Sequence, residues 1–182
     1  MVLTNSSSCN LNWKPKNFNF ISIHGNESSI YDSKGPNGLL IMFICNHCPY
    51  VKSIEQKISI ETKRIQKIGV ESIAFMSNDQ DLYREDSNNS LLEQISRANF
   101  NFPYILDSNQ EIGRSFDAQC TPEFYFFNKN LELNYRGRLD SNGKEPEMGH
   151  PELYYAIEEV ISKGYCSTQQ YPSIGCSIKW KN

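Results

Sequence analysis

The run LLIMFICNHCPYVK (39–52) carries the strongest structural signal in the chain. Its first six residues are all apolar and follow the turn-forming sequence GPNG (35–38), a pattern typical of a strand buried on both faces of a sheet. Beyond it, apolar residues recur at helical spacings until Gly69, and glycine commonly ends a helix. These residues are Val51, Ile54, Ile58, Ile65 and Ile68. The run therefore predicts a buried strand that leads directly into a long helix.

The flanking sequence predicts further strands. FNFISI (18–23) and SSIYD (28–32) are joined by a polar turn, so we expect a β-hairpin that closes near Gly25 and Asn26. Apolar or alternating runs recur later in the chain, and the last two predict a hairpin at one edge of the sheet. These runs are ESIAFMS (71–77), PYIL (103–106), EFYFFN (123–128) and LELNYRGRL (131–139).

Capping patterns indicate where helices begin. Ser90 with Glu93, and Ser108 with Glu111, have the spacing of a capping box, in which two side chains bond backbone N–H groups at a helix N-terminus. A last helix is expected over residues 151–164, with the proline at its first position and the glycine at its end. Its apolar stripe is Leu153, Ile157, Val160 and Ile161.

Strands and helices alternate along the chain, and an antiparallel hairpin follows them. This order predicts an α/β fold with a mixed central sheet, helices on both of its faces and an N-terminal β-hairpin extension. A length of 182 residues suits a single domain. We divide that domain into the hairpin extension (about 11–37), a core (about 38–164) and a C-terminal tail (about 165–182).

Composition excludes several classes of protein. The net charge is −3 and no basic stripe is present, so nucleic acid is not an expected partner. The longest apolar run, residues 39–45, is far shorter than the roughly 18 residues of a membrane span. The N-terminus lacks the basic and apolar regions of a secretory signal, so we expect a cytoplasmic protein. In that reducing compartment, six cysteines favour catalytic or metal-binding roles over a disulfide framework.

Two of the cysteines, Cys45 and Cys48, form a CxxC motif at the junction between the predicted strand and helix. The first turn of a helix has N–H groups without intrahelical partners and about half a positive charge, which stabilises a thiolate. A CxxC motif and a neighbouring protonated histidine also lower the pKa of a cysteine thiol. Residues three apart lie on one helical face, within reach of a disulfide. The motif therefore predicts a redox-active dithiol of the thioredoxin type.

The order of the two cysteines suggests their roles. Cys45, expected to be the more exposed, would attack a target disulfide, and Cys48, one turn deeper, would then resolve the mixed disulfide. His47 would add positive charge beside Cys45, or else simply face solvent. The pair Thr121-Pro122 precedes a strand, and a cis bond there would expose backbone groups beside the dithiol to an extended substrate chain.

Five blocks of the sequence carry a family resemblance. They are FICNHCPYVK (43–52), SND (77–79), AQCTPEFYFF (118–127), YRGRLD (135–140) and PSIGCSIKW (172–180). In this order they resemble the bacterial thioredoxin-fold proteins called peroxiredoxin-like, which group with the alkyl hydroperoxide reductase and thiol-specific antioxidant superfamily. The resemblance runs from about residue 11 to residue 181. It implies a thioredoxin-like fold with an N-terminal hairpin, a Cys45–Cys48 redox pair and a cis Pro122.

The sequence departs from better-known members of that superfamily. A peroxidatic cysteine there follows the pattern Pro-x-x-x-Thr/Ser-x-x-Cys. If Cys48 is aligned as the reactive residue, Ile41 and Cys45 stand at the proline and threonine positions. If Cys45 is aligned instead, Gly38 and Met42 stand there, so neither alignment fits. The strand before the dithiol also carries no carboxylate that would move a proton to the second cysteine.

We therefore expect a thiol–disulfide oxidoreductase that cycles a Cys45–Cys48 dithiol and acts on protein or small-molecule disulfides. It would need a reducing partner system and no bound cofactor. A peroxiredoxin-like thiol peroxidase is the alternative that the superfamily implies. A metal-binding module is a further alternative, in which the CxxC holds zinc or Cu(I) with one more ligand. Candidates for that ligand are Cys120, His47 and His150, but no second CxxC is present and no metal is expected.

Five further residues near the predicted site are candidates, and all but Cys176 have two interpretations. Cys120, just before the Thr-Pro pair, is a third redox thiol or a buried structural thiol. Glu123 would move protons to the dithiol, or else is an exposed acid at the end of a strand. Cys176 would fold back as a resolving thiol. Arg136 and Arg138 would bind an anion near the site, or else lie on a solvated edge strand.

The remaining two cysteines, Cys9 and Cys166, stand alone in the sequence. We expect both to be small buried hydrophobic residues, because free cysteine is among the residue types most often found inside proteins.

Overall fold

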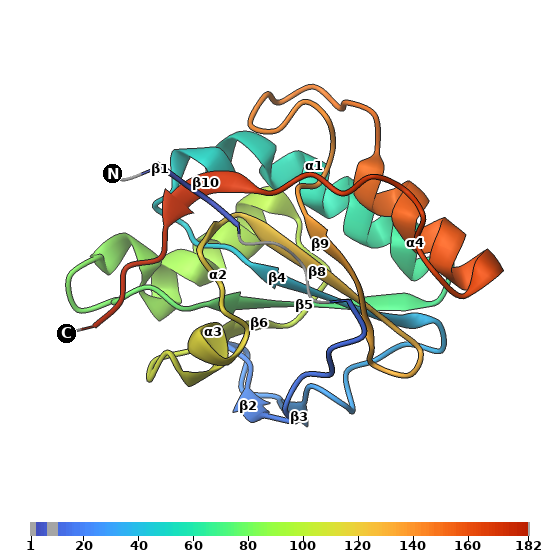
Figure 1. Cartoon of the computed structure of the whole chain (residues 1–182). Coiled ribbons are helices and arrows are strands. Elements are labelled where there is room, and N and C mark those ends of the chain that lie inside the picture. Colours follow the sequence, from blue (N-terminus) through green and yellow to red (C-terminus); the bar gives the residue numbers. More distant parts are fainter. Residues whose placement is uncertain (1–2, 7–10, 182) are drawn as a thin grey trace.

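The structure is a computed structural model that describes residues 3–6 and 11–181, and a mixed β-sheet lies at its centre (Figure 1). Across this sheet lie β6 (Tyr104–Leu106), β5 (Val70–Met76), β4 (Gly38–Phe43), β8 (Glu123–Asn128) and β9 (Leu133–Gly137). β5 and β6 pair in parallel, whereas β8 pairs antiparallel with both β4 and β9. β5 lies beside β4, where the Ile44 N–H donates to the Phe75 carbonyl at 3.2 Å.

The central strand β4 is buried along its whole length, as its apolar sequence predicts. Leu40 and Met42 pack into one hydrophobic core, while Leu39, Ile41 and Phe43 pack into a second core on the opposite face. Side chains alternate between the two faces of a strand, so burial of both faces requires every residue to be apolar.

Helices cover both faces of the sheet, in agreement with the prediction (Figure 1). The first core is covered by α1 (Pro49–Gln66), α2 (Asn88–Ala98) and α4 (Glu152–Lys163). The second core is covered by the short helix α3 (Glu111–Ser115) and by the N-terminal segment. The expected hairpin is present as β2 (Asn19–Ile21) and β3 (Glu27–Ser29), which pair antiparallel across a turn at Gly25.

A second, smaller sheet brings the two ends of the chain together. In it, β10 (Ile174–Ser177) pairs antiparallel with β1 (Leu3–Asn5) on one side and with β7 (Cys120–Thr121) on the other. β10 also packs beside α1 (Figure 1). The C-terminal segment therefore returns to the part of the fold that carries the CxxC motif, which gives it a role in building the site.

Both predicted capping boxes are wrong. Ser87, three residues before Ser90, is the N-cap of α2. α3 begins after Gln110 rather than after Ser108, because the buried Asp107 carboxylate accepts hydrogen bonds from the N–H groups of Ile112 and Gly113 at 3.2 and 2.8 Å. A charged acceptor binds these N–H groups more strongly than a serine hydroxyl does. A three-residue 3₁₀ turn, η1 (Arg84–Asp86), precedes α2.

The last helix differs from its prediction in two details. Pro151 is the N-cap of α4 rather than its first helical residue. Ile161, expected in the apolar stripe, is 39% exposed, whereas Leu153, Ile157 and Val160 are buried. Gly164 ends the helix as predicted, in a left-handed conformation with a φ of 86° that favours glycine.

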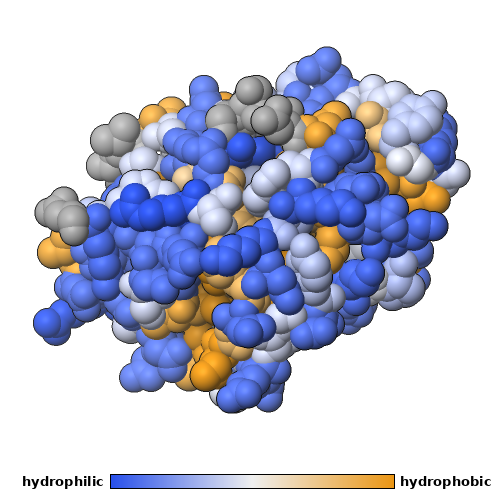
Figure 2. Space-filling view, turned by 60° about the horizontal axis from the view of Figure 1, so that its bottom comes forward, coloured by the Kyte–Doolittle hydropathy of each residue, from blue (hydrophilic) through white to orange (hydrophobic). Residues whose placement is uncertain are grey.

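Figure 2 shows the face that carries the β2–β3 hairpin. Hydrophilic residues cover most of this face, and hydrophobic residues gather there only in small areas between polar ones. Within residues 3–6 and 11–181, none of the helices has both the length and the apolar character that crossing a membrane requires.

Candidate active site

The CxxC loop connects β4 to α1 and is buried. Cys45 and Cys48 are both 0% exposed, so the expectation that Cys45 is the more accessible thiol is wrong. Thr121 covers the pair from the β7 side: its hydroxyl lies 3.3 Å from Cys45 Sγ and its carbonyl 3.2 Å from Cys48 Sγ. β10, paired with β7, places Cys176 Sγ 3.0 Å from Cys48 Sγ.

Cys48 is the N-cap of α1, and Pro49 occupies the first helical turn, where proline is tolerated because its missing N–H needs no intrahelical partner. A hydrogen bond from the Cys45 thiol, supported by others from Cys176 and the Val51 N–H, outweighs the cost of burial and lowers the pKa of Cys48 to about 5. The positive end of the helix dipole favours the same ionised form. Cys48 is therefore the more acidic thiol of the CxxC pair.

Cys45 holds its proton more tightly than Cys48 does. Burial, then the hydrogen bond with Cys48 and the negative charge of Asp86, raise its pKa well above the ordinary value. The sequence analysis placed the stabilised anion on Cys45, and the structure places it on Cys48. The physical reason is position, because Cys48 caps the helix whereas Cys45 lies before it and beside a carboxylate.

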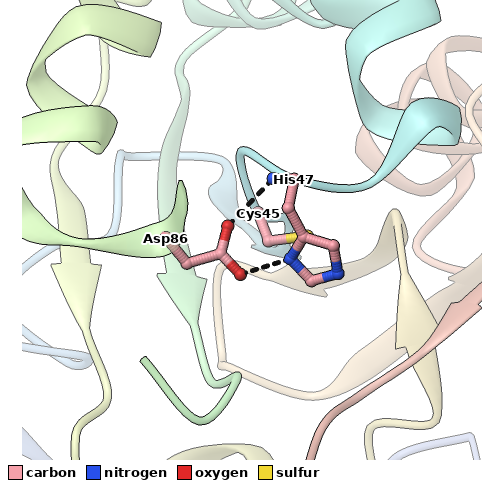
Figure 3. Close-up of side chains that lie close together, drawn as sticks. All are labelled: Cys45, His47 and Asp86. Atoms are coloured by element: carbon pink, nitrogen blue, oxygen red, sulfur yellow. Dashed lines mark hydrogen bonds and ion pairs between the residues drawn. The ribbon is translucent and has the colours of Figure 1, made fainter. Parts of the chain in front are cut away.

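Asp86 organises the loop from outside the motif (Figure 3). Its Oδ1 accepts hydrogen bonds from the N–H groups of Asn46 and His47 at 2.8 and 2.9 Å, and its Oδ2 lies 2.6 Å from His47 Nδ1. The His47 ring stacks on Tyr83 at 4.9 Å, so it does not simply face solvent. The sequence analysis missed Asp86, which lies in a polar stretch where nothing distinguishes it from its neighbours.

Residues of η1 and α2 hold the CxxC loop from the side on which Asp86 lies. Asn46 donates to the Glu85 carbonyl at 2.8 Å and accepts from the Arg97 guanidinium at 2.9 Å. Gln94 donates to the Cys45 carbonyl at 3.2 Å. The buried polar groups of Asn46 and the Cys45 carbonyl are thus paired with groups of η1 and α2, whereas His47 Nε2 is buried without a hydrogen-bond partner among the described residues.

The Thr121-Pro122 peptide bond is cis, as the family resemblance implied. The strand edge before it does not stand open to a substrate, because β7 already pairs with β10 in the register Cys176 to Thr121 and Ser177 to Cys120. The chain's own C-terminal strand therefore occupies the edge that the sequence analysis assigned to an extended substrate.

Glu123 is not an exposed acid at a strand end, because it is 0% exposed and lies 2.7 Å from the Arg136 guanidinium. Its other oxygen accepts from the Gln119 N–H at 2.9 Å, which ties the segment before Pro122 to β8. Burial raises the pKa of Glu123 even with Arg136 beside it. These contacts indicate that Glu123 positions the cis-proline loop.

Arg136 is not solvated as one interpretation expected, and Arg138 is only partly exposed. Arg136 is buried against Glu123, and Arg138 forms a two-pronged ion pair with Glu152 at 2.7 and 2.7 Å. Both guanidinium groups are thus engaged with carboxylates, and neither contributes a hydrogen bond to the dithiol in the part of the chain that the structure describes.

The remaining cysteines lie in different environments. Cys120 is fully buried with backbone carbonyls 3.9 Å from its sulfur, and burial raises its pKa, which favours the structural interpretation. Cys166 is half-buried and contacts the Thr168 carbonyl, so it is not the enclosed residue we expected. Cys9 lies outside the described residues.

The residues proposed as a metal site do not gather as expected. In the described ranges, the grouped ligand atoms are those of Cys45, His47 and Asp86, which lie within 4.8 Å of one another. Cys48, Cys120 and His150 are not part of this group. Both oxygens of Asp86 already accept hydrogen bonds, so a metal ion would have to displace them.

A cavity of about 230 Å³ with a mainly apolar lining flanks the dithiol loop. Tyr50 at the start of α1, Pro122 and Ile174 of β10 line it, together with two cationic residues, Arg138 and Lys144. Its position beside the cis-proline and the covering strand makes it the nearest place for an apolar side chain of a substrate.

This chain is similar to several known proteins in sequence and in structure. The model of the AhpC/TSA family matches residues 12–136. An uncharacterized conserved protein from Geobacillus kaustophilus has 35% identity and a TM-score of 0.91, covering 100% of this chain and 97% of its own. A hypothetical protein from Sinorhizobium meliloti 1021 has 30% identity and a TM-score of 0.88, covering 98% of each chain.

A more distant structure supports the fold alone. The thioredoxin domain of a thiol-disulfide oxidoreductase from Bacteroides vulgatus has 15% identity and a TM-score of 0.64, and the match covers 85% of this chain and 99% of that domain. The predicted α/β thioredoxin-like fold is thereby confirmed. None of the curated proteins matches this chain.

Proposed function

This chain belongs to the AhpC/TSA family, and from that premise we propose that it is a thiol–disulfide oxidoreductase that cycles Cys45 and Cys48 between dithiol and disulfide. The observation that carries the proposal is the Cys48 thiol, whose pKa is about 5. A thiolate is the form that attacks a disulfide. Its substrates are protein or small-molecule disulfides, and a reducing partner system restores the dithiol.

The arrangement of the two sulfurs supports the following steps. The Cys48 thiolate attacks one sulfur of a target disulfide, forms a mixed disulfide and expels the other sulfur as a thiolate. Cys45 then attacks Cys48 Sγ, which closes the Cys45–Cys48 disulfide and releases the second target sulfur. The proton of Cys45 passes to a departing thiolate, and two electrons move from the dithiol to the target. Cys48 is thus the attacking cysteine and Cys45 the resolving one, which is the reverse of the roles that their order in the sequence suggested.

Burial of both sulfurs restricts which targets react. A target disulfide reaches Cys48 only when the covering strand β10 moves aside, because Cys48 is 0% exposed beneath it. The cavity beside Pro122 and Tyr50 is lined mainly by apolar residues. We therefore expect targets with an apolar side chain next to the reactive disulfide.

The test is the rate at which the protein, with dithiothreitol as the electron donor, reduces the disulfides of insulin. Cys45→Ser and Cys48→Ser should each reduce this rate to that of dithiothreitol alone. Cys166→Ser is the matched control and should leave the rate unchanged, because Cys166 contacts a loop carbonyl away from the dithiol. Equal rates for the wild type, Cys45→Ser and Cys48→Ser would show that the proposal is wrong.

The redox potential decides whether the protein reduces or oxidises its targets. Titration of the Cys45–Cys48 pair against glutathione buffers measures it, and 30 mV corresponds to about 1.4 kcal/mol for a two-electron couple. A potential below that of the cytosolic glutathione pool favours a reductant, and a potential above it favours an oxidant.

A thiol peroxidase is the second candidate, supported by the family and by the low pKa of Cys48. The missing proline and threonine of the peroxidatic pattern count against it. Stopped-flow mixing of the reduced protein with hydrogen peroxide separates the two functions. Oxidation of Cys48 no faster than that of free cysteine would exclude the peroxidase.

A further inference from the structure

Within residues 3–6 and 11–181, Cys48 has two sulfur neighbours. One is Cys45 in its own motif, which forms a hydrogen bond with it. The other is Cys176 on β10, whose Sγ lies 3.0 Å away and which shares a second hydrogen bond with the same sulfur. A single sulfur that touches two thiols is a point at which a disulfide can be exchanged between them.

Strand pairing fixes Cys176 in this position. Cys176 lies opposite Thr121, the residue whose hydroxyl and carbonyl contact Cys45 and Cys48. The adjacent Gly175 packs against the Thr121 carbonyl so closely that a Cβ atom at this position would overlap it. Only glycine lets β10 approach β7 to this distance, and the approach is what brings the third sulfur to Cys48.

Cys120 provides a comparison, because it is a buried thiol in a different environment. It lies on the neighbouring strand β7 and is also fully buried, but the contacts of its sulfur are backbone carbonyls at 3.9 Å. Burial and the hydrogen bond with Cys48 raise the pKa of Cys176 to about 12, so Cys176 keeps its proton beside Cys48 while the site is reduced.

We propose that Cys176 is a third redox-active thiol, which converts the Cys45–Cys48 disulfide into a Cys48–Cys176 disulfide. The proposal rests on the function proposed above. Cys176 loses its proton and its Sγ attacks Cys48 Sγ, so that the Cys48–Cys176 bond forms as the Cys45–Cys48 bond breaks. The electron pair leaves on Cys45 Sγ, which takes up the proton that Cys176 lost. One disulfide replaces another, so no outside oxidant or reductant takes part in the exchange.

The exchange has a consequence for access to the site. In the reduced form that the structure shows, β10 is held over the dithiol by hydrogen bonds with β7 and by packing against α1. In the Cys48–Cys176 form, the same strand is covalently tied to the sulfur that it covers. The C-terminal strand thus behaves as an internal substrate, lying on the cis-proline edge where an extended target chain was expected.

The test maps disulfides in the full-length chain. Trypsin should release both CxxC cysteines in one peptide, residues 35–52, and Cys176 in another, residues 164–179. Because the second peptide also contains Cys166, all variants carry Cys166→Ser. The protein is oxidised with diamide, its remaining thiols are blocked with N-ethylmaleimide, and the digested peptides are measured by mass spectrometry.

We expect two products from the chain with an intact site: the internally closed peptide 35–52, and peptide 35–52 linked to peptide 164–179. Cys45→Ala should give the linked pair as its main product, and Cys48→Ala should abolish it. Cys120→Ser is the control and should give the same two products as the intact site. Circular dichroism of each variant confirms that it is folded. The chain with the intact site carries no substitution apart from Cys166→Ser.

One outcome would overturn the role of Cys176 and leave the oxidoreductase proposal standing. In it, peptide 35–52 closes in the intact site, but neither the intact site nor Cys45→Ala gives any linked pair. A linked pair that persists in Cys48→Ala would also overturn this role, because the exchange would not pass through Cys48. Absence of both the closed peptide 35–52 and the linked pair in the intact site would instead contradict the proposed function.

Discussion

The Asp86 carboxylate binds His47 at two points, with Oδ2 2.6 Å from the ring Nδ1 and Oδ1 2.9 Å from the backbone N–H. It also accepts from the Asn46 N–H at 2.8 Å and from the Asn78 amide at 2.9 Å. Asp86 is 0% exposed, so these four donors replace the water that a carboxylate normally binds. The shape of the CxxC loop therefore depends on a residue of η1 that lies far from the motif in sequence.

Asp86→Ala should lower the free energy of unfolding by about 2–4 kcal/mol, because buried donors lose a charged acceptor. Chemical denaturation of the reduced protein measures the change. Asp81→Ala is the matched control, since the Asp81 side chain is 78% exposed and its ion pair with Lys181 lies at the surface. That control should change stability by less than about 0.5 kcal/mol. Equal losses in the two variants would contradict the role given to Asp86.

Cys48 should titrate as a thiolate well below the range of an ordinary cysteine. Its pKa is lowered to about 5, so the thiolate is present above that pH and is lost as the pH falls through it. The ultraviolet absorbance of the thiolate, taken as the difference between wild type and Cys48→Ala, follows this ionisation. Cys45→Ala should raise the pKa of Cys48, because the hydrogen bond from Cys45 is the largest cause of its lowering. A Cys48 pKa near that of free cysteine in the wild type would contradict the assignment.

Much of the fold could be predicted because its strongest elements are local in sequence. The run 39–44 is apolar at every position, and the structure buries every residue of β4. Val51, Ile54 and Ile58 follow at helical spacing and are buried on α1. Strand β8 likewise has the bounds predicted from its aromatic run, Glu123–Asn128.

The parts of the site that sequence did not predict are made by contacts between distant segments. β10 is short and contains Gly175, so it carries no strand pattern, and its pairing with β1 and β7 depends on the whole fold. The position of Cys48 at the start of the helix could be inferred from the sequence, but the charge of Asp86 beside Cys45 could not. That charge raises the pKa of Cys45 and so contributes to which of the two thiols ionises. The burial of Cys45 likewise depends on Thr121 of β7, which contacts its sulfur, and on β10, which pairs with β7.

The buried pair of Glu123 and Arg136 should stabilise the cis-proline loop only as a pair. Arg136→Met should lower the free energy of unfolding by about 3–5 kcal/mol, because it leaves the buried Glu123 carboxylate without its cation. The double variant with Glu123→Gln should lose less than the sum of the two single variants, as a double-mutant cycle measures. Arg114→Met, at an exposed position, is the control. Additive losses would show that the two side chains act independently.

Lys57 should hold the loop that follows β9. Its ammonium group is buried, lies 2.9 Å from Asp140 Oδ1 and donates to the carbonyls of Gly143, Glu145 and Glu147. Lys57→Met should cost about 3–5 kcal/mol, because it leaves Asp140 as an uncompensated buried charge. Limited proteolysis should then cut residues 141–149 faster than in wild type. Lys52→Met, on the exposed side of α1, should leave the cleavage rate unchanged, and a similar rate in Lys57→Met would contradict this role.

Gly175→Ala should separate the redox behaviour of Cys176 from that of the CxxC pair. The added Cβ atom would overlap the Thr121 carbonyl, so β10 must move away from β7 and carry Cys176 with it, at a cost of about 1–3 kcal/mol in stability. After oxidation, peptide 35–52 should still close internally, whereas its link to peptide 164–179 should decrease. Ile174→Ala, on the same strand but 47% exposed, is the control and should keep both products. An undiminished link in Gly175→Ala would show that Cys176 reaches Cys48 without the close pairing of β10 and β7, and the structural basis given for the exchange would then be wrong.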